Sequence, residues 1–286
     1  MIITTHQMSS TQLTDLQHLM NDCKNNDGSI PNLYLYILGQ ERAFPASILY
    51  YEDNKLVGFL SAYFFYEDAV EIGLLVHPSL RRKGIAHKLI QAIVPLIQLQ
   101  NYTRLIFSNP SYKNNSWLLN GGFVFLHSEY YMERDALAPI LKSNHDLDFS
   151  IATLTDIKIL CELDEACFPK KEDNLLHRFQ HLLSNHEYQI ILAFVNQQPI
   201  GKAHMRWEEH GASLSDIAVI PARQGRGLGS NLIAHCINLA LSEGKPRLNL
   251  DVETHNKKAL DLYIRLGFAI QNACDYWSIE LSQVLK

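Results

Sequence analysis

Apolar residues follow two kinds of pattern in the N-terminal half of the chain. Short apolar runs between turn residues are typical of strands, whereas apolar residues three and four positions apart are typical of amphipathic helices. Helical spacing begins at Leu13, Leu16 and Leu19, behind Ser and Thr residues that can cap a helix. Further along we expect strands at 46–51, 56–66, 69–77, 104–108 and 124–133, a helix at 85–99 and a weakly specified helix within 109–120.

The C-terminal half repeats this order of elements more cleanly. Helices that alternate with both hairpins and strand–helix–strand units predict an α/β fold, in which helices flank a twisted mixed sheet. The pattern predicts strands at 149–153, 189–196, 200–207, 212–220 and 247–253, helices at 154–167, 175–183, 230–244 and 256–266, and a closing segment from Phe268 onward.

Two sequence marks recur at nearly one period. Segment 76–86 lies over 219–229 at an offset of 143 residues, and Gly122-Phe123 lies over Gly267-Phe268 at an offset of 145. A fixed period of about half the chain indicates a duplicated domain. The polar, aperiodic segment 143–146 is the best linker, so the predicted domains are 1–142 and 147–286.

Composition narrows the class of protein. The chain has 286 residues, 47% hydrophobic and 19% charged, so it can bury two ordinary cores. A formal charge of −5 and a pI near 6.2 argue against nucleic-acid and membrane-surface partners. Five scattered cysteines without CxxC and thirteen histidines without HExxH predict neither a disulfide framework nor a metal site. With no leader-like N-terminal segment we expect a soluble cytoplasmic protein, and monomer or homodimer stays open.

The most informative stretch is a glycine-rich loop between a predicted strand and a predicted helix. The strand at 217–220 is followed by the loop 222–229, which contains Gly225, Gly227 and Gly229. Glycine permits a tight turn, and the unpaired amides at the start of a helix attract an anion such as a pyrophosphate. The pattern therefore predicts a phosphate-binding corner.

Three kinds of anion-binding loop are possible here. The phosphate loop of nucleotide hydrolases needs Gly-Lys-Ser/Thr where this chain has Gly229-Ser230-Asn231, and the dinucleotide fingerprint needs a third glycine where Ser230 stands. The run 224–229 instead fits the pattern Gln/Arg-x-x-Gly-x-Gly/Ala. It resembles the acyl-CoA pyrophosphate loop of the GNAT superfamily of N-acetyltransferases.

A second motif follows in the expected order. After a strand at 248–253, Asn256, Ala259 and Tyr263 have the spacing Asn-x-x-Ala-x-x-x-Tyr, and Gly267-Phe268 follows the helix. This segment resembles the later motif of the same superfamily, and the chain is identified as a tandem two-domain member of it. The resemblance implies the mixed-sheet acetyltransferase fold in both halves and acetyl-CoA as the acyl donor.

The resemblance also implies where acetyl-CoA binds. Its pyrophosphate would meet the loop, its pantetheine arm would lie beside 217–219 like an added strand, and the Val219 amide would stabilise the oxyanion. The expected cofactor-binding residues are Ile217, Ala218, Val219, Arg223, Gln224, Gly225, Arg226, Gly227, Leu228, Gly229, Ser230, Asn256 and Tyr263. Asn256 could also cap the following helix, because an Asn side chain there accepts a hydrogen bond from a first-turn amide.

Acetyl transfer to an amine needs an acid for the leaving thiolate and a base for the ammonium. Tyr263 is the candidate acid, although its place on an apolar helix face with Leu262 and Leu266 also suits simple packing. Glu253 and Asp216, on the strands that enter the two motifs, are the candidate bases.

The first copy keeps the loop but lacks the candidate acid. Its Arg-x-x-Gly-x-Ala pattern predicts a possible second cofactor site at Val76, Arg81, Arg82, Lys83, Gly84, Ile85 and Ala86. Leu118 stands at the position of Tyr263, Gly73 at that of Asp216, and Ser111 and Asn114 at those of Asn256 and Ala259. We therefore predict a degenerate first domain, with nearby Tyr112 left open as a substitute acid.

Together these residues predict an N-acetyltransferase (EC 2.3.1.-) that transfers an acetyl group to a primary amine by direct attack in a ternary complex. The alternative is an acyl-CoA-binding sensor or interaction protein with little turnover. The acceptor stays open among small amines, aminoglycosides, polyamines, amino acids and peptide N-termini. The cluster Glu208, Glu209 and His210 and the negative net charge favour a cationic one.

Overall fold

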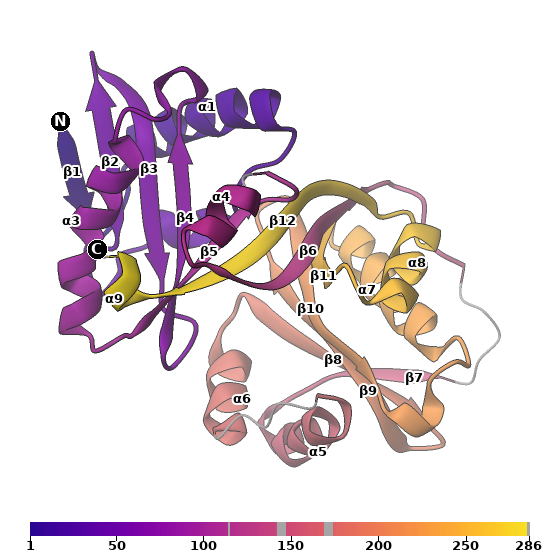
Figure 1. Ribbon diagram of the computed structural model, residues 1–286. Helices are drawn as coiled ribbons and strands as arrows, with labels where there is room; N and C mark the ends of the chain where they lie inside the picture. The colour runs from indigo at the N-terminus through magenta and orange to yellow at the C-terminus, as the bar shows by residue number, and fades with distance from the viewer. Residues whose placement is uncertain (114, 142–146, 169–173, 285–286) are drawn as a thin grey trace. The chain divides into compact units, whose positions relative to one another are not determined.

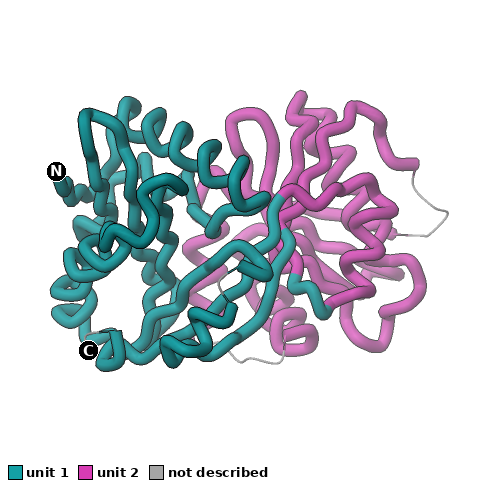
Figure 2. The backbone as a smooth tube through the Cα atoms, turned by 45° about the horizontal axis from the view of Figure 1, so that its top comes forward, with its two compact units in different colours: residues 1–130, 253–255, 272–286 teal, residues 131–252, 256–271 magenta. Residues whose placement is uncertain are grey.

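The computed structural model describes residues 1–113, 115–141, 147–168 and 174–284 (Figure 1). The chain forms two compact units (Figure 2). Unit 1 contains residues 1–130, 253–255 and 272–286, and unit 2 contains residues 131–252 and 256–271. The predicted linker 143–146 lies outside the described residues.

Unit 1 is built on a mixed sheet with the strand order β1-β2-β3-β4-β5-β12. Only the β4–β5 pair among these neighbours is parallel, and its ladder ends at Ile72–Phe107, before either strand ends. The two strands therefore separate at their carboxyl ends. The elements are β1 (Ile2–Thr5), α1 (Ser10–Asp27), α2 (Leu35–Leu38), β2 (Ser47–Glu52), β3 (Lys55–Tyr63), β4 (Ala69–Val76), α3 (Ile85–Leu99), β5 (Arg104–Pro110), α4 (Asn115–Asn120), β6 (Val124–Asp135), β12 (Ala269–Glu280) and α9 (Leu281–Val284).

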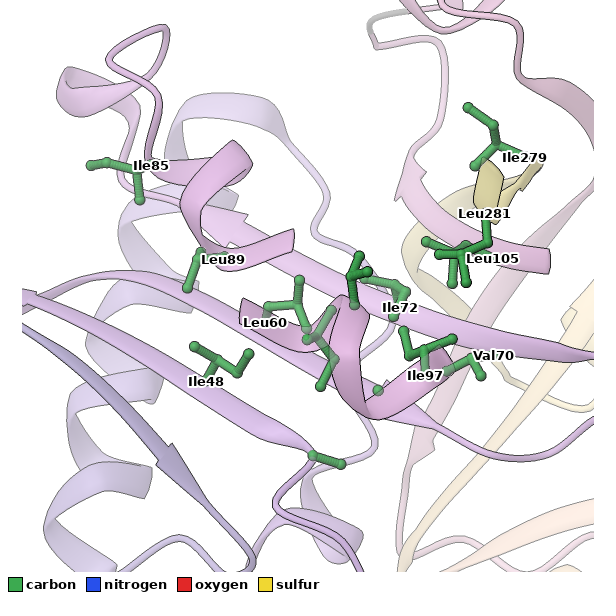
Figure 3. Close-up of a cluster of buried hydrophobic side chains, with 14 of the residues drawn as sticks. Ile48, Leu60, Val70, Ile72, Ile85, Leu89, Ile97, Leu105, Ile279 and Leu281 are labelled. Carbon is green, nitrogen blue, oxygen red and sulfur yellow. The ribbon is translucent and has the colours of Figure 1, made fainter. Parts of the chain in front are cut away.

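Helices cover both faces of the unit 1 sheet, since alternate strand residues point to opposite faces. On one face Ile85, Leu89 and Ile97 of α3 pack with strand residues such as Leu60 and Ile72 (Figure 3). The opposite face is covered by α1, which buries Leu16, Leu19 and Cys23 against Leu49, Leu56, Phe59, Tyr63 and Leu75. This arrangement confirms the predicted α/β fold with a mixed sheet between helices.

Unit 2 repeats the plan with the strand order β6-β11-β10-β9-β8-β7. Its parallel pair is β10–β11, which is in register only from Gly211–Arg247 to Ser213–Asn249. The antiparallel ladder between β9 and β10 has a bulge between Ser215 and Ala218. The elements are β7 (Asp148–Ile151), α5 (Ile157–Cys167), α6 (Leu175–Ser184), β8 (Tyr188–Val195), β9 (Gln198–Trp207), β10 (Gly211–Val219), α7 (Leu228–Ser242), β11 (Arg247–Glu253) and α8 (Lys257–Arg265).

The closing strand of each repeat belongs in part to the compact unit formed by the other repeat. Residues 131–135 of β6, from the first repeat, belong to unit 2, whereas residues 272–280 of β12, from the second repeat, belong to unit 1. There β12 pairs antiparallel with β5, from Cys274–Pro110 to Glu280–Arg104. The predicted boundary between domains 1–142 and 147–286 is a boundary of the sequence repeat and stays a prediction. The compact units differ from it at β6 and β12.

Among the described residues, no helix is both long and apolar enough to cross a bilayer. All five cysteines are free thiols, and Cys23, Cys236 and Cys274 are buried. Burial raises the pKa of the Cys236 thiol to about 12, so this residue is a core side chain and not a reactive thiolate.

Candidate functional site

The glycine loop of unit 2 runs from the end of β10 to the start of α7. After a single 3₁₀ turn at Pro221–Arg223, Gly225 and Gly227 have φ values of 74° and 78°, in the left-handed region that glycine tolerates best. Gly227 is the N-cap of α7 and offers no side chain to the first turn. Among the residues that the structure describes, the first amide of α7 with a partner is that of Asn231, which donates to the Gly227 carbonyl. Within this part of the chain the amides of residues 228–230 therefore remain available to an anion.

The equivalent loop of unit 1 has the same local geometry. A 3₁₀ turn at Pro78–Leu80 precedes Gly84, which has φ 81° and is the N-cap of α3. A cavity of about 650 Å³ opens at this corner, within the size range of small-molecule sites. Six of the seven residues predicted for a second cofactor site line it, all but Lys83: Val76, Arg81, Arg82, Gly84, Ile85 and Ala86.

The first residue of each loop pattern holds the loop to its own strand. The Gln224 side-chain amide donates to the Val219 carbonyl at 2.9 Å, and Arg81 Nε donates to the Val76 carbonyl at 3.1 Å. Arg81 also pairs with Asp27 through two hydrogen bonds of 2.9 and 2.5 Å. Gln224 and Arg81 therefore stabilise the loops themselves. The backbone amides of each loop and the neighbouring charged side chains are left to bind a ligand.

Tyr263 lies on α8, with 8% of its surface exposed. Its ring packs edge-on against Phe268 at a centroid distance of 6.0 Å, and within the described part of the chain its hydroxyl has no hydrogen-bond partner. Burial raises the pKa of Tyr263 to about 12, so the phenol is protonated at neutral pH, as an acid must be. Its counterpart Leu118 is buried in α4, whereas Tyr112 is 85% exposed.

Asn256 caps α8. Its side-chain oxygen accepts a hydrogen bond of 3.2 Å from the Ala259 amide. The capping prediction is therefore confirmed, and contact with a cofactor stays a prediction. In the first copy Ser111 instead donates to Asp275, and Asn114 lies outside the described residues.

Asp216 lies in the β9–β10 bulge and is ion-paired. Its Oδ2 is 3.0 Å from Arg178 Nη2 and 3.2 Å from His204 Nδ1. Burial opposes ionisation of Asp216, but the hydrogen bond from His204 and the nearby positive charges outweigh it and hold the pKa of the carboxyl well below its usual range. Such a carboxylate is a weak base.

Glu253 ends β11 and is half-exposed, with its Oε2 2.9 Å from His255 Nδ1. Its carboxylate and the ligand atoms of His127 and Glu129 lie within 4.8 Å of one another, a grouping that could hold a metal ion. His127 Nε2 is 3.3 Å from Glu129 Oε1, and this hydrogen bond raises the pKa of His127. The sequence analysis missed both neighbours, because they lie on β6, more than 120 residues before Glu253.

The three residues of the 208–210 cluster differ in their surroundings. Glu208 accepts a hydrogen bond of 2.7 Å from Arg206 and one of 3.2 Å from Asn249. Glu209 and His210 are exposed and 3.7 Å apart. Glu208 therefore has partners in its own chain, and the other two are surface residues.

The comparisons with known proteins point to one family. The model of the Acetyltransferase (GNAT) family matches residues 13–116 and 157–268. Thialysine N-epsilon-acetyltransferase of Bos taurus is 35% identical over 75 residues, 26% of this chain and 44% of that protein. Mycothiol acetyltransferase of Jonesia denitrificans is 39% identical over 72 residues, 24% of this chain and 23% of that protein. The matches thus span less than half of these relatives.

Two solved structures share the fold over nearly the whole chain. A GCN5-related N-acetyltransferase from Sphaerobacter thermophilus has a TM-score of 0.76 at 16% identity, covering 98% of this chain and 96% of that one. A tandem GNAT protein from the clavulanic acid biosynthesis pathway has a TM-score of 0.69 at 14% identity, covering 98% of both chains. With the family model matched in both halves, the chain belongs to the GNAT acetyltransferase family, as a tandem member with two such domains.

Proposed function

We propose that this protein is an N-acetyltransferase that transfers the acetyl group of acetyl-CoA to a primary amine by direct attack in a ternary complex. The observation that carries the proposal is Tyr263, a buried and protonated phenol on the helix after β11. The other repeat has Leu118 at this position, which cannot donate a proton. Names of the relatives, such as thialysine N-epsilon-acetyltransferase, support an amine as acceptor.

The donor would bind along β10 and the glycine loop. The free amides of residues 228–230 and the charges of Arg223 and Arg226 suit the pyrophosphate. The separation of β10 from β11 after Ser213 leaves room for the pantetheine arm beside Ile217–Val219 in this proposal. The Val219 amide, by family resemblance, would stabilise the oxyanion.

In the proposed step the neutral amine attacks the thioester carbonyl, so a C–N bond forms and the C–S bond breaks. Tyr263 gives its proton to the leaving thiolate and regains one from solvent. Glu253 first accepts a proton from the acceptor ammonium, which gives the neutral amine, and passes it to water. The proton that the nitrogen loses after the C–N bond has formed goes to solvent. Glu253 suits this role better than Asp216, whose ion pairs make it a weak base.

The overall proposal is tested by thiol release from acetyl-CoA across a panel of amines, amino acids, polyamines and aminoglycosides. Release that depends on the amine supports the enzyme. Tight acetyl-CoA binding without release for any amine would favour the alternative, an acyl-CoA sensor.

Glu253→Gln is expected to lower kcat/KM about tenfold, because an amide accepts no proton. The loss is modest since the half-exposed site leaves water as a second proton acceptor. Steady-state kinetics measure it, with the exposed Glu209→Gln as control. An unchanged kcat/KM in Glu253→Gln would remove this residue from the mechanism.

We also propose that unit 1 binds acyl-CoA without catalysing transfer, on the strength of its loop, its cavity and Leu118. Calorimetric titration is expected to give two molecules of CoA per chain. Arg82→Glu, in the cavity wall, should abolish one site, and Arg226→Glu, in the unit 2 loop, should abolish the other. A stoichiometry of one that Arg82→Glu leaves unchanged would contradict the second site.

A further inference from the structure

A network of charged side chains lies beneath α5 and α6 of unit 2. The side chains of Lys202 and His204, on β9, are 0% and 1% exposed. Lys202 Nζ forms an ion pair with Asp164 of α5 and is 3.0 Å from His204 Nε2. Arg178 of α6 closes the network, with hydrogen bonds of 3.5 Å to Asp164 and 3.0 Å to Asp216.

The contacts fix the protonation of His204. Since the Lys202 ammonium donates to Nε2, the ring carries its proton on Nδ1 and donates it to Asp216. Burial lowers the pKa of His204, which favours this neutral form. Lys202 in turn lies over the rings of Phe168 and Phe179, 5.5 and 5.0 Å from their centroids. The Asp216 carboxylate is thus held by two donors whose own positions are fixed.

The backbone at Asp216 is in an unfavourable conformation. Its φ is 46°, in the left-handed region, which is unfavourable for a residue with a Cβ. The residue lies in the bulge, where Ser215 pairs with His204 and Ala218 with Lys202, so two residues oppose one. The segment Ile217–Val219 follows directly, and its direction depends on the bulge.

Unit 1 provides an internal comparison. At the same offset of 143 residues, Phe59, Ser61 and Gly73 stand where unit 2 has Lys202, His204 and Asp216. The β3–β4 ladder there is regular from Gly58–Val76 to Tyr63–Glu71, with no bulge. A Cβ on Gly73 would clash with Leu33 Cδ2 and come within 2.9 Å of the Asn32 carbonyl oxygen, so a side chain has no room at this position. The repeat without the tyrosine thus also lacks the charges and the bulge.

We infer that Asp216 is a positioning residue of the acetyl-transfer site: its carboxylate, held by His204 and Arg178, maintains the β10 bulge that directs the backbone of residues 217–219 toward the donor. Asp164 and Lys202 act one step further away, because they fix His204 in the required tautomer. The inference rests on the proposed function, which supplies the donor.

Three variants at one position test this assignment. Asp216→Ala loses the carboxylate and keeps the unfavourable φ, whereas Asp216→Gly loses the carboxylate but adopts that φ freely. Asp216→Asn keeps a hydrogen-bond acceptor for His204 and tolerates a positive φ. We expect kcat to fall about 30-fold or more in Ala, which loses the anchor and keeps the strain, about tenfold in Gly, which loses only the anchor, and about threefold in Asn, which keeps a hydrogen-bond acceptor. Equal losses in all three would assign a chemical role to the carboxylate and overturn the inference.

Donor binding supplies a readout that needs no turnover. The Kd of acetyl-CoA, measured by calorimetry, should rise about tenfold in Asp216→Ala and about fivefold in Asp216→Gly, and stay within about twofold of the wild type in Asp216→Asn. Hydrogen–deuterium exchange of the 214–220 backbone should be faster in Ala and Gly and unchanged in Asn. The exposed Asp135→Ala, which loses a pair with Arg247, is the control for removal of a carboxylate from unit 2. Unaltered binding and exchange in Ala overturn the inference.

These readouts separate the two proposals. If the wild type has no amine-dependent turnover, the proposed function fails, yet the order of the Kd values still decides the positioning role. If Asp216→Ala does not fold, the comparison of Gly with Asn decides the positioning role. A tenfold loss of kcat in Asn, with wild-type binding of acetyl-CoA, would show that the carboxylate acts chemically.

Discussion

Tyr263→Phe is expected to lower kcat about 100-fold and to change the Kd of acetyl-CoA less than twofold. The variant removes only the hydroxyl, which is the proposed proton donor for the thiolate, and loss of a general acid costs this much or more. The ring can keep its contact with Phe268. Thiol release at saturating acetyl-CoA and amine measures kcat, and calorimetry measures binding.

The structure also predicts that this variant is as stable as the wild type. Among the described residues the Tyr263 hydroxyl has no partner, so phenylalanine leaves no buried group unpaired. Tyr112→Phe, in unit 1, is the matched control and should retain full activity, since Tyr112 is 85% exposed. Wild-type kcat in Tyr263→Phe would reject the acid role, and a loss in Tyr112→Phe would assign it to the first repeat.

Lys202→Met is expected to lower the free energy of unfolding of unit 2 by about 3 kcal/mol, because it removes the buried partner of the Asp164 carboxylate and leaves only the 3.5 Å contact with Arg178. Methionine keeps the packing against Phe168 and Phe179, so the loss isolates the charge. Urea unfolding measures it by the fluorescence of Trp207 on β9. The other two tryptophans, Trp117 and Trp277, are replaced by phenylalanine in the reference protein.

A double variant that also replaces Asp164 is the control for this prediction. Asp164→Leu with Lys202→Met should recover most of the lost stability, because neither charge then remains buried without the other. Lys158→Met, which removes an exposed pair with Glu162, should cost little. A loss in Lys202→Met no larger than in Lys158→Met would show that the buried pair contributes nothing to stability.

Local pattern was enough for most elements. The predicted helix at 85–99 is α3 to the residue, and the predicted strands at 46–51 and 69–77 are β2 and β4 within one residue. Three elements of unit 1 were missed, β1, α2 and α9, because four residues are too few to show a period. The helical spacing at Leu13, Leu16 and Leu19 did not indicate where the helix ends, since α1 continues to Asp27 and is capped by Gly28 in the left-handed conformation.

The position of the closing strands could not be read from the sequence. Both β6 and β12 follow a Gly-Phe pair and have twelve residues, so each fits the edge of either sheet by local pattern. Strand pairing is decided by contacts between residues more than 100 positions apart in the chain, and a single sequence does not reveal these contacts.

Sequence patterns predicted the backbone features of the site but not the network of charged side chains next to it. Glycines that require φ > 0 and an Asn cap leave direct sequence signals, and both are in place. Lys202 and His204 alternate with Ala203 and Met205, the pattern of a strand with one solvent face. They are buried because α5 and α6 cover that face with Asp164 and Arg178, which the pattern of the strand cannot reveal.

The place of β12 in unit 1 has a consequence for synthesis on the ribosome. Unit 1 needs residues 272–286, which are made after all of unit 2, so the sheet of the first unit stays incomplete while about half the chain is translated. During that time the edge of β5 lacks its antiparallel partner and is open to pairing with another chain. A nascent chain stalled before residue 272 should therefore be the species that depends most on chaperones. Most of its residues have already left the ribosome at that point.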